Sequence, residues 1–158
     1  MRPEEYEALA ALTLAAYRHL LGPDMDAGYA AELADVAGRA DLADVLVALD
    51  GAEQPVGGVT YVPGPGPLAW FDRPDEAGMR MLAVAPGAQR QGVGAALVAA
   101  CVARAAGAGK ARLHLHTTAP MIVAQRIYER AGFHRHVEGD RVLEGGLRLL
   151  AYVLDLGR

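Results

Sequence analysis

The sequence predicts an α/β fold, a mixed β-sheet with helices on its faces. Three observations support this prediction. Helical and extended patterns alternate along the chain, two extended runs are joined by a short turn as in a hairpin, and an apolar strand passes through a glycine-containing turn into a long apolar helix. The length suits one hydrophobic core, and no repeat or linker divides the chain, so we expect a single domain over residues 1–158.

The individual elements follow from hydrophobic spacing and from the turn residues that end each run. Gly22-Pro23 ends the first helical pattern, and Gly132 caps the last one. The predicted elements in chain order are helices at 4–21 and 29–39, strands at 44–50 and 56–62, a strand at 79–84, a helix at 93–106, a strand at 111–117, a helix at 120–131, and closing strands at 133–137 and 146–154.

Two segments carry side chains of chemical interest. In strand 111–117, alternation places Leu113 and Leu115 on one face and His114 and His116 on the other. The connection over residues 63–75 is rich in Gly and Pro, long for a compact domain, and contains Trp70 and Phe71. These two aromatic residues either hold the loop on the core or face a substrate, and the sequence leaves both roles open.

Composition excludes several classes of function. The formal net charge is −4 and no basic run is present, which argues against a nucleic-acid partner. Apolar stretches are interrupted well before the length that spans a membrane, and acidic residues replace the basic start of a signal peptide, so we expect a cytoplasmic location. The single cysteine, Cys101, excludes an internal disulfide and lies among small apolar residues, where a buried, inert thiol is the ordinary outcome.

Residues 81–95, MLAVAPGAQRQGVGA, have the pattern of an anion-binding turn. The first N–H groups of a helix have no partner within the helix, and the helix dipole favours negative charge there. Gly92 and Gly94 let the backbone approach an anion closely, although a glycine pair here is also consistent with a tight connection alone. The phosphate motif G-x-x-x-x-G-K-[ST] is absent, and without G-x-G-x-x-G a dinucleotide-binding fold is disfavoured.

The segment from Gln89 to Gly94 does match Q-x-x-G-x-G, which resembles the acyl-CoA-binding motif of the GNAT superfamily of acyl-CoA-dependent N-acyltransferases. A second segment, AQRIYERAGFHRH at 124–136, is similar to the other signature of that superfamily through Tyr128, Gly132 and Phe133. One helix and one strand separate the two segments, as in the family. The resemblance is clearest over residues 79–133.

The resemblance implies a GNAT-like sheet that splays open beside strand 79–84 and holds acetyl-CoA, the acyl donor, in the V. Backbone groups near Leu82 and Val84 would pair with the pantetheine amides, and the pyrophosphate would lie on the N–H groups from Arg90 to Ala95. The implied cofactor-binding residues are Leu82, Ala83, Val84, Gln89, Arg90, Gln91, Gly92, Val93, Gly94 and Ala95. No metal site is expected.

The implied reaction transfers the acetyl group from acetyl-CoA to an amine of a small molecule or a peptide by direct attack, through a tetrahedral intermediate. An alkylamine has a pKa of about 10 and must lose a proton before it attacks. By its place in the motif, Tyr128 is the candidate acid beside the cofactor sulfur, and backbone N–H groups near Val84 are candidates for stabilising the oxyanion. The competing interpretation of Tyr128 is a core aromatic residue with a hydrogen-bonded hydroxyl.

The general base is open, because the sequence departs from the family at this point. Many members carry Glu at the position of Gly78, which has no side chain. Glu76 lies two residues earlier on the same strand face, and His116 ends the neighbouring strand with an intrinsic pKa suited to proton transfer. An exposed acid and a structural histidine are equally consistent with these two residues. Met121 stands where many relatives have Asn.

Other departures keep a second function open. The family's first strand is missing, so either this edge strand is dispensable or the natural N-terminus lies upstream. Because Gly78 leaves the usual base position empty, a binding module that holds acyl-CoA as a sensor or assembly element is the alternative to an enzyme. A homodimer is a further possibility that the sequence does not decide. The acceptor side, formed by loop 63–75 and the two N-terminal helices, has a mixed apolar and acidic character that permits a cationic amine.

Overall fold

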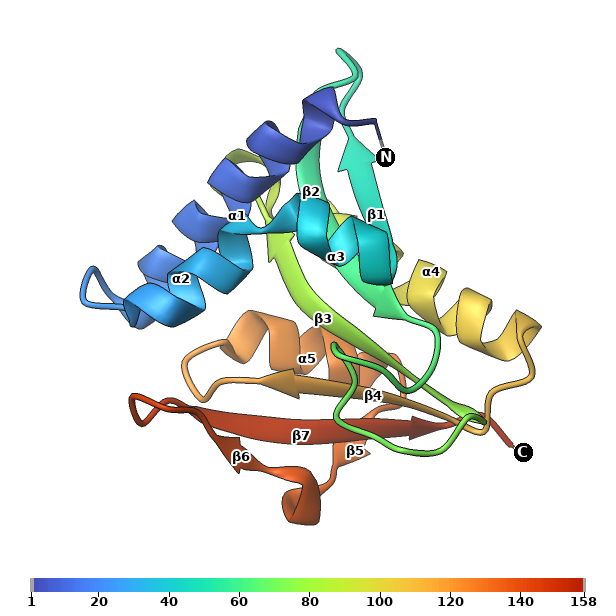
Figure 1. Ribbon diagram of the computed structural model, residues 1–158. Coiled ribbons are helices and arrows are strands. Elements are labelled where there is room, and N and C mark those ends of the chain that lie inside the picture. The colour runs from blue at the N-terminus through green and yellow to red at the C-terminus, as the bar shows by residue number, and fades with distance from the viewer. Residues whose placement is uncertain (1, 158) are drawn as a thin grey trace.

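The computed structural model describes residues 2–157, which form a seven-stranded sheet with the order β1-β2-β3-β4-β7-β5 and β6 paired to β7 (Figure 1). The strands are β1 Asp44–Leu49, β2 Pro55–Val62, β3 Glu76–Val84, β4 Arg112–Thr117, β5 His134–Arg135, β6 Arg141–Val142 and β7 Arg148–Asp155. The α-helices are α1 Glu4–Leu21, α2 Ala27–Ala34, α3 Val36–Leu42, α4 Val93–Gly107 and α5 Ile122–Arg130, and the 3₁₀ turns are η1 Pro86–Ala88 and η2 Val137–Gly139.

Helices cover both faces of the sheet. Adjacent glycines of β2 show this directly, because a Cβ on Gly57 would meet Val93 and Leu97 of α4, whereas a Cβ on Gly58 would meet Leu9 of α1. Neighbouring strand residues point to opposite faces, so α1 and α4 lie on opposite sides of β2. The predicted mixed α/β sheet with helices on its faces is confirmed, and no strand precedes α1 within residues 2–157.

The sheet splays open between β3 and β4. These two strands run parallel and pair from Glu76 with Arg112 to Met79 with Leu115, and there the pairing stops. Beyond this point β3 stays paired with β2 as far as Val84, while β4 stays paired with β7 as far as Thr117. Figure 1 shows the two strands leaving a common end and diverging. The predicted V-shaped opening is therefore present.

A β-bulge lies in β3 where the opening begins. Between the pairs Gly58–Ala83 and Thr60–Arg80, β2 has one residue and β3 has two, Met81 and Leu82. Met81 has φ +58°, a left-handed conformation that is rare for a residue with a side chain. A bulge bends its strand and re-aims the following side chains. This bulge turns the end of β3 away from β4.

The predicted helix over residues 29–39 is wrong, because the structure has two helices in this segment. Asp35 adopts φ −82° and ψ +64°, which ends α2, and its Oδ1 accepts a hydrogen bond from the Gly38 N–H at 2.9 Å, which caps α3. Aspartate is a preferred N-cap because its carboxylate satisfies an unpaired N–H of the first turn. The apolar spacing continues through both helices and hides this break.

The closing strands also differ from the prediction. The segment predicted as one strand over 133–137 contains only the two residues of β5 before η2 begins, and β6 then pairs with the start of β7. Asp140 holds this turn, because its carboxylate accepts hydrogen bonds from Arg135 and from the Ala151 N–H. Strand β3 begins at Glu76, three residues earlier than predicted.

The main core lies between the sheet and the helices α4 and α5, and Cys101 is fully buried within it. Burial raises the pKa of the Cys101 thiol to about 12, so the thiol is not a nucleophile at neutral pH. A smaller cluster joins α1 and α2 to the end of β3.

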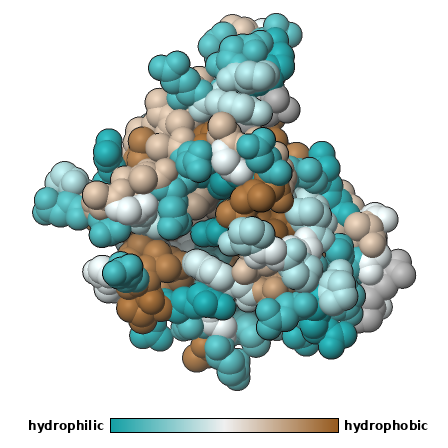
Figure 2. Space-filling view, in the orientation of Figure 1, coloured by the Kyte–Doolittle hydropathy of each residue, from teal (hydrophilic) through white to brown (hydrophobic). Residues whose placement is uncertain are grey.

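Within the described residues, no helix combines the length and apolar character that crossing a membrane requires. On the face of the molecule that Figure 2 shows, hydrophilic side chains lie between the apolar ones.

Candidate functional site

The turn before α4 presents a run of free backbone donors. Within the described chain, no backbone or side-chain acceptor bonds the N–H groups of residues 90–95, and Ala96 is the first to donate, to the Gly92 carbonyl. No side chain caps this helix, and its first turn contains no acidic residue. Helix α4 has 15 residues, so its dipole adds positive potential at this end. Unpartnered donors at a positive helix end are the kind of geometry that suits an anion.

Different features of the structure explain why glycine occupies the two glycine positions of the motif. Gly92 has φ +81° and open space around the position of a Cβ, so its left-handed backbone explains the glycine. A Cβ on Gly94 would lie 3.0 Å from Cδ1 of Ile127, so this glycine allows close packing of α4 against α5. Arg90 also has a positive φ, +64°, which is uncommon for a residue with a side chain.

The exposed edge of β3 beyond the split is the second feature of the site. The Ala85 N–H donates to the Val56 carbonyl on β2, so the backbone groups of Val84, one residue earlier, point the opposite way. Gln89 Nε2 donates a hydrogen bond to the Val84 carbonyl at 3.4 Å, so the Gln89 side chain borders this edge. By the same alternation Ala83, which pairs with Gly58, faces β2. The edge can therefore pair with an extended amide-containing ligand.

A pocket lies on the α1 and α2 side of the split. It is a partly open hollow, with about 410 Å³ of empty space that includes open solvent. The lining residues are Tyr17, Tyr29, Trp70, Met79, Arg80, Met81, His116, Thr117, Thr118, Met121 and Leu149. Parts of the chain that are distant in sequence, from α1 to β7, thus meet where β3 and β4 separate.

Tyr128 lies on α5 behind this split. Its side chain is buried and packs against Phe133 and Tyr152, with ring centroids 6.0 Å and 6.2 Å away. Burial, and to a smaller extent Cys101, raises the pKa of Tyr128. Burial most, and then the charges of Tyr29 and Tyr128, raise the pKa of the pocket residue Tyr17.

His116 lines the pocket from the end of β4. Its Nε2 lies 2.9 Å from the Gly139 carbonyl oxygen, which only accepts, so Nε2 carries the proton and Nδ1 keeps its lone pair. Trp70 packs edge-on against the imidazole at 4.6 Å. Burial lowers the pKa of His116 from 6.5 to about 4, against the opposing effect of the Gly139 hydrogen bond. The side chain is therefore neutral at physiological pH.

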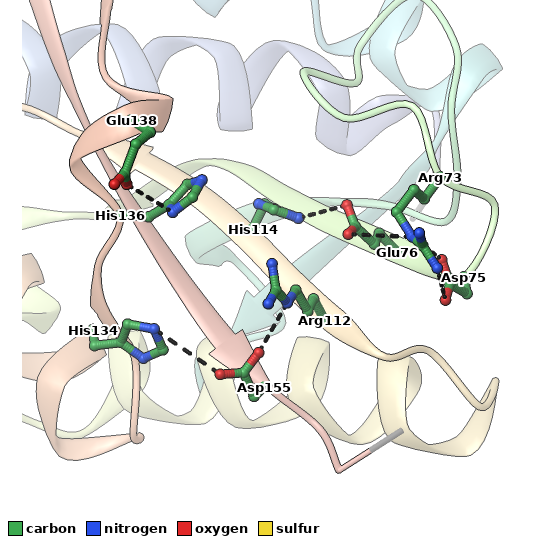
Figure 3. A network of polar contacts seen from close by, with 9 residues as sticks. All are labelled: Arg73, Asp75, Glu76, Arg112, His114, His134, His136, Glu138 and Asp155. Atoms are coloured by element: carbon green, nitrogen blue, oxygen red, sulfur yellow. Dashed lines mark hydrogen bonds and ion pairs between the residues drawn. The ribbon is translucent and has the colours of Figure 1, made fainter.

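Glu76 lies at the other, paired end of β3 and does not line the pocket. Its Oε2 is 2.8 Å from Nε2 of His114, and its Oε1 is 3.9 Å from Arg73 (Figure 3). Three residues of strand, roughly 10 Å, separate it from the last paired residue of β3. The structure thus brings His116, but not Glu76, to the place where the strands split.

Loop 63–75 fills the space left by Gly78. A Cβ on Gly78 would lie 2.9 Å from Cε1 of Phe71, whose ring stacks on His114 at 5.4 Å. Trp70 instead lines the pocket, between His116 and the guanidinium of Arg80. The two aromatic residues therefore divide the two roles that the sequence left open, with Phe71 holding the loop and Trp70 facing the pocket.

Sequence reasoning missed Arg80, Tyr17, Tyr29 and Thr118 as lining residues, and the acidic side chains expected on the acceptor side do not line the pocket. Met121 is buried, and its sulfur accepts from Thr117 Oγ1 at 3.5 Å. An arginine in the middle of a mostly apolar strand, GMRMLAV, was the one available signal. The tyrosines and the threonine carry no such signal, because their positions depend on how α1, α2 and β4 come together.

A family model described as acetyltransferase (GNAT) family matches residues 7–133, most of the chain, and the protein belongs to this family. No curated protein matches the sequence significantly. The fold is similar to an acetyltransferase of the GNAT family from Staphylococcus aureus Mu50, with a TM-score of 0.77 and 16% identity over 99% of this chain and 96% of that one.

Two further solved structures share the fold, one with acetyl-CoA and the other with coenzyme A. The yncA protein from Salmonella typhimurium, solved with its cofactor acetyl-CoA, has a TM-score of 0.71 and 19% identity over 100% of this chain and 92% of that one. The PaiA N-acetyltransferase from Thermoplasma acidophilum, in complex with coenzyme A, has a TM-score of 0.71 and 12% identity over 98% and 95% of the two chains.

The lowered pKa of His116 predicts a loss of stability in acid. Between pH 6.5 and about 4 the unfolded chain binds a proton at this residue and the folded chain does not, so the free energy of unfolding falls as the pH falls through this window. The loss amounts to up to about 3 kcal/mol. Urea unfolding across this pH range measures it. His116→Gln should remove most of this loss, whereas His19→Gln, at an exposed position of α1, should retain it.

Proposed function

We propose that the protein is an N-acetyltransferase that transfers the acetyl group of acetyl-CoA to an amine of a small molecule or a peptide. The observation that carries this proposal is the meeting of three features at one split in the sheet. These are the free N–H groups before α4, the unpaired edge of β3, and a pocket on the opposite side. A long ligand can enter from one side and a small one from the other.

The residues of the split fit acetyl-CoA as the acyl donor. The N–H groups of residues 90–95 suit the pyrophosphate, because they are unpartnered donors at a positive helix end. The edge at Leu82 and Val84 suits the pantetheine amides, which would add to the sheet as a short strand does. Acetyl-CoA supplies the activated acetyl group. The acetyl-CoA and coenzyme A complexes of the two relatives with this fold support the same assignment.

His116 is our choice for the base that prepares the amine. An amine with a pKa of about 10 arrives protonated, and its proton must leave before attack. Nδ1 of His116, a pocket residue near the end of β4, has a free lone pair. Its lowered pKa makes it a weak base, so we propose that it passes the proton on to solvent. Glu76, bound to His114 at the far end of β3, would reach the amine only through water.

Tyr128 is our choice for the group that stabilises the leaving sulfur. Its hydroxyl stays protonated at neutral pH because burial raises its pKa. That pKa lies above the value of about 8.5 for a thiol, so the hydroxyl donates a hydrogen bond to the thiolate more readily than it gives up its proton. Backbone N–H groups beside the Met81 bulge are candidates for the oxyanion.

Release of coenzyme A thiol separates catalysis from passive binding. We expect calorimetry to detect acetyl-CoA binding, and a thiol-detecting assay to show release that depends on an added amine, across a panel of small amines and peptides. An enzyme accelerates release with at least one amine, and mass spectrometry then finds that amine acetylated. Tight binding without amine-dependent release across the panel would favour the acyl-CoA-binding module over the enzyme.

Tyr128→Phe tests the role of the hydroxyl. Removing one hydrogen bond to developing charge should lower kcat by about 10²-fold or more, since such donors contribute most in the transition state. The Kd for acetyl-CoA should change by less than about threefold, because the ring and its packing remain. A matched control is Tyr152→Phe, which alters a neighbouring ring in the same core. Equal kcat for Tyr128→Phe and the wild type would remove Tyr128 from the mechanism.

A further inference from the structure

Arg80 is the one charged side chain among the residues that line the pocket within the described chain, and no aspartate or glutamate lines it. We propose that the acceptor carries a carboxylate as well as its amine, and that the guanidinium of Arg80 holds this carboxylate. The substrate class is then a small amino acid rather than a simple alkylamine. This inference rests on the proposed function, which it makes more specific.

The guanidinium of Arg80 is largely buried but poorly satisfied. Its side chain is 17% exposed, and it makes one long hydrogen bond within the described residues, from Nη1 to the Leu68 carbonyl at 3.3 Å. Five N–H donors are available on a guanidinium, so several are left for a ligand. Buried donors without partners are unfavourable, and a carboxylate can take two of them at once.

Glu32 does not neutralise Arg80 well. The closest oxygen of Glu32 is 3.9 Å from Nη2, beyond hydrogen-bond distance, and the Glu32 side chain is 63% exposed. A second buried arginine, Arg39, shows the hydrogen bonding of an arginine with a purely structural role. Its guanidinium hydrogen-bonds to Thr60 and to the carbonyls of Glu32 and Leu33, so its nitrogens all have partners. Arg80 differs from Arg39 in having donors to spare where it faces a pocket.

Other features of the pocket also favour an anion. Thr118 Oγ1 is fully buried without a hydrogen-bond partner in the described chain, although Thr118 lines the pocket. Buried hydroxyls are normally paired, so an unpaired one at a pocket wall is a candidate ligand contact. Tyr29 adds a second hydroxyl, which stays a neutral donor because burial raises its pKa to about 12. The pocket wall near Arg80 thus offers the hydroxyls of Thr118 and Tyr29 and no carboxylate.

The position of Arg80 limits the length of the acceptor. Arg80 directly follows Met79, the last β3 residue that pairs with β4, so it stands at the point where the strands separate. Trp70 holds the guanidinium in place, with the ring centroid 4.8 Å from the guanidinium carbon. A carboxylate on Arg80 and an amine at the split therefore belong to one small molecule.

Binding to the protein saturated with coenzyme A tests this inference without turnover. The probes are amino acids and their α-carboxamides, compared as pairs by calorimetry. A carboxylate on a buried arginine should make at least one acid bind about tenfold or more tightly than its amide. If no acid in the panel binds more than threefold better than its amide, the inference is overturned. This comparison uses the unaltered protein and does not depend on the stability of any variant.

Two arginine variants then test whether Arg80 causes the preference for acids over amides. Arg80→Gln should bring the acid-to-amide ratio close to one while the Kd for coenzyme A stays within about threefold. Arg141→Gln is the matched control, because Arg141 lies 4.9 Å from the same Trp70 ring but does not line the pocket, and it should keep the preference. An unchanged ratio in Arg80→Gln would contradict the role of Arg80.

The outcomes separate this inference from the function on which it rests. Amine-dependent thiol release with no preference for acids would leave the acetyltransferase proposal standing and remove the carboxylate site. A clear preference for acids in binding, with no thiol release from any amine, would support the carboxylate site and contradict the enzyme.

Discussion

The end of hydrogen bonding between β3 and β4 is the constraint on which the rest of the site depends. Parallel pairing stops at Met79 and Leu115, although both strands continue with other partners. Backbone groups at an unpaired strand edge require another partner or water. The split therefore creates a ligand-binding edge and a gap through the sheet at the same time. The bulge at Met81 sustains it by bending β3 away, and its left-handed backbone is the strain that this geometry requires.

Burial determines what the side chains at this gap can do. It raises the pKa values of Tyr128 and Tyr29 and lowers that of His116, so both hydroxyls and the imidazole are neutral at physiological pH. It also leaves Arg80 as a cation with few partners. Because the site combines polar groups with low solvent access, each hydrogen bond to a ligand is stronger than it would be in water. Selectivity for an acceptor can then come from very few contacts.

Much of the fold could be predicted from sequence because its signals are local. Apolar spacing and glycine predict a strand, a turn and a helix over residues 81–95. The structure has β3, η1 and α4 there. The break at Asp35 was missed because apolar spacing runs through both α2 and α3, whereas the cap depends on one side chain. Several residues that line the pocket were missed for a different reason. Tyr17, Arg80 and Thr118 come from α1, β3 and the segment after β4, and only the folded chain brings them together.

The family assignment and the empty position at Gly78 make acyl-CoA binding at the split the central claim. Amide chemical shifts of the ¹⁵N-labelled protein, followed while coenzyme A is added, test it most directly. We expect the largest shifts at the N–H groups of residues 90–95 and at Leu82 and Val84, since these are the unpartnered donors and the open edge of β3. Saturable binding that leaves these amides unshifted, or no binding at all, would contradict the claim.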